Sequence, residues 1–115
     1  MTPPIAPLRI PIFAAGTTGT SDAIDVSNYS NFAVYLTSVG TTSGGTIAIE
    51  EADYAPGATP YSGTWSRIVT INASDVSGTG QLAYHTLYRC IANLRIRIAT
   101  TITGGGTIAA VLRGN

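Results

Sequence analysis

The stretch LRIRIATTITGGGTIAAVLR, residues 94–113, decides the fold class of this 115-residue chain. Its first residues alternate between apolar and basic, as expected for a β-strand with one buried and one outward side. The apolar side holds Leu94, Ile96 and Ile98, and the outward side holds Arg95 and Arg97. A glycine-rich turn at residues 101–106 and a second strand at 107–113 follow. We therefore predict a β-hairpin here.

The five letters GGTIA from this stretch occur twice, at residues 44–48 and 105–109. The similarity extends further, because residues 33–48 align with residues 94–109 as strand, threonine-rich connector, glycine pair and strand. One interpretation is that two β-hairpins, with glycines supplying positive φ, occupy equivalent places in a two-sheet sandwich. The faces that this alignment matches are Ala33, Tyr35 and Thr37 in the first copy and Leu94, Ile96 and Ile98 in the second. The alternative is that threonine- and glycine-rich hairpins converge on similar letters.

The rest of the chain repeats the same alternation of short strands and turns. Further strands are expected at 32–38, 46–52 and 64–71, loops at 53–63 and 72–81, and two short strands around a bend within 82–92. Nothing longer than about ten residues has a helical period, so we predict an all-β sandwich of roughly seven or more strands with almost no helix. The expected core comprises Leu94, Ile96, Ile98, Ile68, Ile108, Leu112 and either Val34 or Tyr35.

The N-terminus is rich in proline and in apolar residues. Prolines at positions 3, 4, 7 and 11 exclude a helix and confine any strand to a sheet edge. We predict that residues 1–13 form an extended arm with a first edge strand and that residues 14–115 form one sandwich domain. Residues 1–7 are expected to cross to a neighbouring subunit, and 8–13 to complete its sheet; the alternative is an edge strand of the chain's own domain. The predicted partner contacts of the arm are Pro3, Pro4, Ile5, Pro7, Leu8 and Arg9.

Charge is scarce in this chain and balances to zero. Charged residues are 10% of the sequence, against roughly 25% in an ordinary soluble domain, and all six basic residues are arginine. There is no basic run of the kind that binds duplex nucleic acid and no apolar stretch of about 20 residues that would span a bilayer. A weakly charged surface gains little solubility from self-repulsion, which favours an assembly protein over a free monomer.

Catalytic signatures are absent from the sequence. Cys90 and His85 are a possible nucleophile and base, but neither lies in a recognised motif. Strand alternation sends Glu50 and Glu51 to opposite faces, so they do not converge as a pair. Glu51 and Asp53 could share a face and hold Ca²⁺, or simply form a solvated strand end. We therefore expect no enzymatic activity, no cofactor and no metal.

Two sets of residues are candidates for binding. The paired guanidinium groups of Arg95 and Arg97 could take a partner's carboxylates, pair with the chain's own acids, or remain solvated. The aromatic residues Tyr54, Tyr61 and Trp65 flank a loop rich in proline and glycine. They could form a platform on which sugars stack, or cap the sandwich core.

The run GTWSRIVTINASDVSGTGQ at 63–81, the pair Tyr88-Arg89 and the stretch at 94–113 together resemble the decoration, or cement, proteins of tailed-phage capsids. The resemblance implies a jelly-roll-like antiparallel β-sandwich with an extended N-terminal arm. It implies a non-enzymatic virion protein on the capsid exterior, assembled in the host cytoplasm, that stabilises the lattice of the major capsid protein. The implied partners are the major capsid protein and further copies of itself, as a dimer or trimer. The alternative is a carbohydrate-binding β-sandwich module of a phage tail or fibre.

Overall fold

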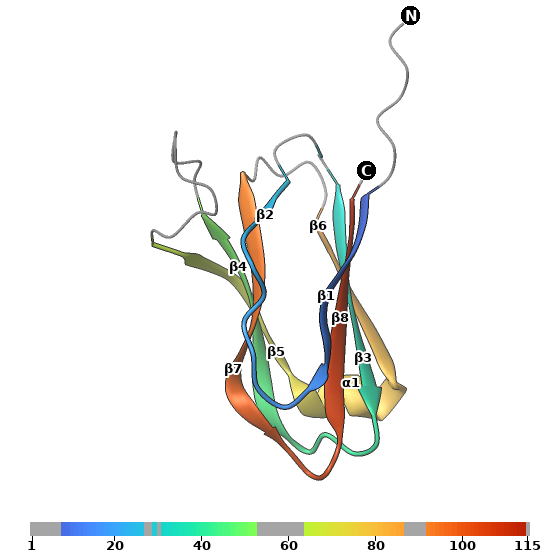
Figure 1. Ribbon diagram of the computed structural model, residues 1–115. Helices are drawn as coiled ribbons and strands as arrows, with labels where there is room; N and C mark the ends of the chain where they lie inside the picture. Colours follow the sequence, from blue (N-terminus) through green and yellow to red (C-terminus); the bar gives the residue numbers. More distant parts are fainter. Residues whose placement is uncertain (1–7, 27–28, 30, 53–63, 87–91, 115) are drawn as a thin grey trace, which may run out of the picture.

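The structure, a computed structural model, describes residues 8–26, 29, 31–52, 64–86 and 92–114. It confirms an all-β sandwich with little helix (Figure 1). The elements are β1 (Leu8–Gly16), β2 (Ile24–Asp25), β3 (Phe32–Val39), β4 (Gly44–Ala52), β5 (Ser66–Asn72), α1 (Ala73–Thr79), β6 (Gln81–Thr86), β7 (Asn93–Thr103) and β8 (Thr107–Gly114).

The strands form two four-stranded sheets, in the orders β1-β8-β3-β6 and β2-β7-β4-β5. All strand pairs are antiparallel. Apart from β4 to β5, each connection between successive strands leads from one sheet to the other. Eight antiparallel strands wound in this order make a jelly roll, so the predicted fold class is confirmed.

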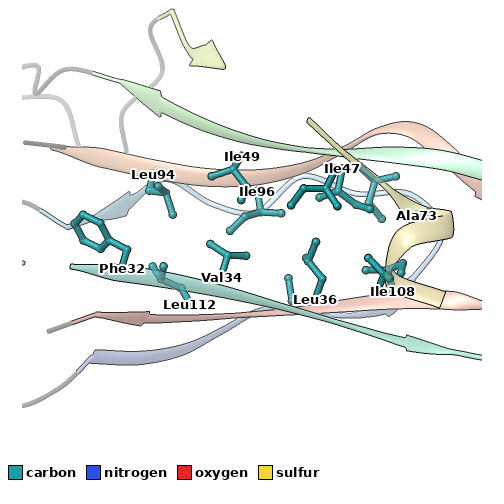
Figure 2. Close-up of a cluster of buried hydrophobic side chains, with 14 of the residues drawn as sticks. Phe32, Val34, Leu36, Ile47, Ile49, Ala73, Leu94, Ile96, Ile108 and Leu112 are labelled. Carbon is teal, nitrogen blue, oxygen red and sulfur yellow. The ribbon is translucent and has the colours of Figure 1, made fainter. Parts of the chain in front are cut away.

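The core lies between the sheets, where alternate residues of facing strands meet (Figure 2). One sheet contributes Phe32, Val34, Leu36, Ile108 and Leu112, and the other contributes Ile47, Ile49, Leu94, Ile96 and Ile98. Each fully buried aliphatic side chain stabilises the fold by about 1.5–3 kcal/mol. Most of the predicted core residues are buried, Val34 rather than Tyr35 fills the core on β3, and Ile68 is only partly buried.

The two GGTIA segments do not form the hairpins that their sequence predicts. β3 and β4 lie in different sheets, and so do β7 and β8, so each glycine-rich connector crosses from one sheet to the other. The matched faces are also shifted, since β3 buries Val34 and Leu36 rather than Tyr35. What the two copies share is one fully buried isoleucine each, Ile47 and Ile108, on opposite sides of the core.

The two glycine-rich connectors lie against one another at the same end of the sandwich (Figure 1). The Ser43 amide donates to the Thr103 carbonyl at 3.0 Å, and the Gly106 amide donates to the Thr41 carbonyl at 2.7 Å. A Cβ on Gly45 would lie 2.7 Å from a backbone oxygen of β7, and Gly45 also has a φ of +105°. A Cβ on Gly106 would lie 2.6 Å from the Thr41 carbonyl oxygen. Glycine therefore permits close backbone contact between the two connectors at Gly106 and between β4 and β7 at Gly45.

A short helix occupies part of the segment predicted as a loop. In α1, Ala73 and Val76 are fully buried, and the Thr42 hydroxyl donates to the Ala73 carbonyl at 2.8 Å. Gly80 ends the helix in a left-handed conformation, with its amide on the Val76 carbonyl. Seven residues show no clear period in a sequence, which is why this helix was not predicted. In the part of the chain that the structure describes, no helix has the length and apolar character needed to cross a membrane.

Strand β1 lies at the edge of the chain's own sheet, next to β8. The prediction that residues 8–13 complete a neighbour's sheet is therefore corrected in favour of its alternative, because the strand's partner is supplied by the same chain. The strand also continues past residue 13 to Gly16. Residues 1–7, expected to cross to a neighbour, lie outside the described residues. In the predicted pair of short strands at 82–92, β6 ends at Thr86, and residues 87–91 are also outside.

Candidate functional site

The outer face of the sheet β2-β7-β4-β5 contains a buried carboxylate. Ile47 and Ile49 of β4 point into the core, so Glu50 points the other way, yet it is only 5% exposed. Ala48, on the same outward side, is fully buried as well. A carboxylate that leaves water on an outer sheet face must be covered and paired.

Arginines of β7 provide both the cover and the pairing. Arg95 donates from Nε to Oε1 of Glu50 at 2.8 Å. Arg97 donates from Nε to Oε1 at 3.1 Å and from Nη2 to Oε2 at 3.2 Å, a two-point contact. The arginine side chains are 25% and 32% exposed, against 7% for that of Glu50. Of the three alternatives for these arginines, the structure therefore shows pairing with an acid of the same chain, Glu50.

The electrostatics of this cluster favour the ionised state of Glu50. Burial alone raises the pKa of the Glu50 carboxyl, but hydrogen bonds from Arg97 and Arg95, together with their charges, lower that pKa below its usual range. The same contact raises the pKa of the Arg97 guanidinium. Glu50 is thus a charged acceptor at neutral pH and holds the two guanidinium groups in fixed positions.

Trp65 joins the cluster through Arg95. The guanidinium carbon of Arg95 lies 4.5 Å from the centroid of the Trp65 ring, in cation–π contact. One face of this ring is therefore covered by an arginine rather than open to a sugar. Tyr54 and Tyr61, the other members of the predicted sugar platform, lie outside the described residues.

A third arginine occupies the position opposite Glu50 on the neighbouring strand β5. Arg67 of β5 is in register with Glu50 and is exposed. Residues in register across an antiparallel pair share a sheet face. We call Arg67, Arg95 and Arg97 with Glu50 the arginine face, because these three arginines and one buried carboxylate lie on the outer side of the same sheet. Asp25, the acid on β2, is in register with Asn93, two positions before Arg95 on β7.

Of the other residues considered for catalysis or metal binding, the two that the structure describes, His85 and Glu51, lie on strands of different sheets. His85 is exposed on β6, with its ring edge-on to that of Tyr35 at 6.2 Å, and Cys90 lies outside the described residues. Glu51 is half-buried, and Asp53 is outside as well. Among the residues that are described, no group of three or more His, Cys, Asp or Glu could hold a metal ion.

The predicted arm contacts are only partly described. Pro3, Pro4, Ile5 and Pro7 lie outside the described part of the chain. Leu8 and Arg9 are in β1, where they pair with Gly114 and Arg113 of β8.

Sequence reasoning missed Glu50 as the centre of the cluster and Arg67 as its third cation. The available signal was the pattern Ala48-x-Glu50-x-Ala52, in which a carboxylate stands between two small residues on the outward side of a strand. Such a side has room for long side chains from neighbouring strands to lie across it. A shallow depression on the outer face of the other sheet was also missed; it is lined by Tyr35, Thr37, Gln81, Val111 and Arg113.

Comparison with known proteins extends only to the fold. No protein-family model and no curated protein sequence matches the chain. The crystal structure of the SPBc2 prophage-derived protein YomS is similar, with a TM-score of 0.60 and 13% identity over 99% of both chains. A subunit of Bacillus endospore appendages, described as disulfide-linked pili, follows with a TM-score of 0.45 and 16% identity over 96% of this chain and 87% of its own. The periplasmic g-type lysozyme inhibitor PliG of Aeromonas hydrophila has a TM-score of 0.36 and 14% identity over 95% and 83%.

Proposed function

We propose that this protein is a non-enzymatic virion protein of a tailed phage that decorates the outer surface of the capsid and stabilises the major capsid protein lattice. The observation that carries the proposal is the arginine face, where a buried carboxylate fixes two guanidinium groups on the outside of a sheet. The jelly roll supports it, because a prophage-derived protein has a similar fold.

The arginine face is suited to acidic groups on a protein surface. Glu50 contacts Arg95 through Nε alone, and a guanidinium group has five N–H donors. The remaining donors can form charge-assisted, two-point hydrogen bonds with a partner's carboxylates. Each arginine side chain has about 2 kcal/mol of rotamer entropy, and pairing with Glu50 has already restricted it before any partner binds. The partner surface is therefore acidic.

The proline-rich terminus is the second proposed contact. Pro3, Pro4, Ile5, Pro7, Leu8 and Arg9 are the residues that we propose to touch the capsid or a neighbouring copy. An extended segment binds through main-chain hydrogen bonds along a sheet edge and needs no special pocket.

A carbohydrate-binding module of a phage tail or fibre is the alternative function. The contact between Arg95 and Trp65 weakens it, because the ring expected to stack on a sugar already has an arginine on one face. Binding to immobilised glycans without any binding to capsid shells would favour this alternative.

The test uses two exposed arginines on opposite sheets. Arg67→Gln removes one charge from the arginine face, and the control Arg113→Gln removes one charge from the other sheet. The assay is cosedimentation with empty shells of the major capsid protein encoded on the same phage genome, at two salt concentrations. We expect Arg67→Gln to weaken binding about five- to tenfold and to reduce its salt dependence, while the control binds as the unmodified chain does. Equal effects of both variants, or no binding by the unmodified chain, would contradict the proposal.

Reversing Arg95 and Arg97 to glutamate is a poor test of the same idea. The double reversal would place two further carboxylates beside the buried carboxylate of Glu50, which already lacks access to water. We expect that variant to unfold, and its loss of binding would then carry no information about the partner.

A further inference from the structure

Two sheets have four edges, and three of them have features that block pairing with another strand. β1 contains the exposed residue Pro11, and its register shifts on both sides of Phe13. β2 has only two residues. β5 contains the exposed Arg67, and the register of its pair with β4 shifts at that position. Proline, charge, short length and irregular register are the devices that protect sheet edges from further pairing.

The fourth edge, β6, has none of these features. Its register with β3 is unbroken from Phe32 opposite Thr86 to Thr37 opposite Gln81. Its sequence, QLAYHT, contains no proline and no formally charged residue. In the described part of the chain the sheet ends at β6, and both Ala83 and His85 are exposed there. A regular, uncharged edge strand is a template for another strand.

We propose that β6 is the docking edge for β6 of a second copy, paired antiparallel about a two-fold axis. The two four-stranded sheets would then form one continuous sheet of eight strands. In β6 the odd-numbered residues point outward and the even-numbered residues point toward the core. For both copies to keep this arrangement, odd-numbered residues must lie opposite odd-numbered residues. The register centred on Ala83 satisfies this condition, because it places Ala83 opposite itself and Leu82 opposite Tyr84.

The side chains of β6 fit a second copy of the same strand. Leu82 and Tyr84 are half-buried and already pack against the core of their own sandwich. Opposite one another they would form aromatic–aliphatic pairs on the core side of the joined sheet, and cross-strand pairs of this kind stabilise sheets. The small side chain of Ala83 permits close approach at the axis, and no like charges meet across it. Two-fold contacts of this kind are the commonest in homo-oligomers.

The first experiment places a cysteine on the proposed axis. Ala83→Cys is made in a Cys90→Ser background, and Thr70→Cys on β5 is the control, since Thr70 is exposed on another edge strand. Residues opposite one another in an antiparallel pair have Cα atoms about 4.5–5.5 Å apart, within disulfide range. We expect oxidation to give a disulfide-linked dimer at Ala83→Cys and none at Thr70→Cys. Equal cross-linking at both positions would overturn the proposal.

The second experiment tests pairing without a covalent bond. Light scattering should give the mass of a dimer for the unmodified chain, and of a monomer for Ala83→Lys and for Ala83→Glu, since like charges would meet at the axis. An equal mixture of the two variants should recover the dimer. A monomeric unmodified chain, or lysine and glutamate variants that remain dimeric, would overturn the proposal. Neither experiment contains capsid shells, so this inference can fail while the proposed capsid role holds, and the converse.

Discussion

Glu50 is the residue at which the fold and the proposed binding surface meet. Its carboxylate loses most of its contact with water on an outer sheet face, and three hydrogen bonds from two arginines replace the lost hydrogen bonds to water. Removing one member of such a cluster leaves the others without a partner, which is generally costlier than the cluster is stabilising. Glu50 therefore fixes the positions of Arg95 and Arg97, and the Trp65 ring gives Arg95 a second contact.

Glu50→Gln should lower the free energy of unfolding by roughly 1–3 kcal/mol, because a neutral amide cannot accept charge-assisted hydrogen bonds from both arginines. The matched control is Glu51→Gln, since Glu51 is the next residue and makes no ion pair among the described residues. Chemical denaturation should find the control within about 0.5 kcal/mol of the unmodified chain. Equal stabilities for both variants would mean that the cluster adds nothing to folding.

The same cluster should make stability dependent on pH on the acid side. The pKa of Glu50 is lower in the folded chain than in the unfolded chain, so the unfolded chain binds more protons as the pH falls. The contribution of Glu50 is fully present above its unfolded pKa and is lost as the pH falls through the lowered folded value. Denaturation curves from pH 7 to pH 2 should therefore show the gap between the unmodified chain and Glu50→Gln shrinking below about pH 4.3. A gap of constant size would contradict the assignment.

Alternation within one strand was enough to predict the core side of β7 and the outward side that holds Arg95 and Arg97. It could not predict Glu50 as their partner, because that contact depends on the register between β4 and β7. Register is a property of two strands, and neither strand's sequence contains it alone. The sequence therefore predicts which face of a strand a side chain lies on, but not which residue of the next strand it contacts.

At the scale of elements, the repeated GGTIA segments show how much a turn composition leaves open. Threonine- and glycine-rich connectors between two strands predict a hairpin when the strands pair, but the same letters here join strands of different sheets. The composition is right for both, since each needs residues that tolerate positive φ and close backbone contact. Hairpin and crossing differ only in which strands pair, and that is decided by the whole sandwich.

The helix α1 is a second case, since burial of Ala73 and Val76 at the end of the core favours it more than any sequence period does.

Gly45→Ala should destabilise the protein by about 3 kcal/mol. The new methyl group would meet the backbone of β7 at 2.7 Å, at a position whose φ of +105° is already unfavourable for alanine. Gly78→Ala is the control, because Gly78 lies in α1 with open space around it and should gain about 0.5–1 kcal/mol. Thermal unfolding distinguishes the two outcomes. Similar stabilities for both variants would show that the contact between Gly45 and the backbone of β7 is not close.

At the scale of the whole molecule, the jelly roll separates surfaces of different character. The arginine face lies on the outside of one sheet, and the uncharged edge strand β6 belongs to the other. Capsid contact through the first and self-association through the second can therefore occur together. The resemblance to decoration proteins pointed to the architecture, but neither the residue pattern nor the composition could show which edge or which face remains open.

The most direct test of the proposed capsid role is a cryo-electron microscopy reconstruction of capsid shells incubated with this protein. We predict added density on the outer surface of the shell that fits the eight-stranded sandwich, with the sheet β2-β7-β4-β5 turned toward the shell. Arg67, Arg95 and Arg97 should lie against acidic side chains of the major capsid protein. Shells without added density, or sandwiches bound with this sheet turned toward solvent, would contradict the account.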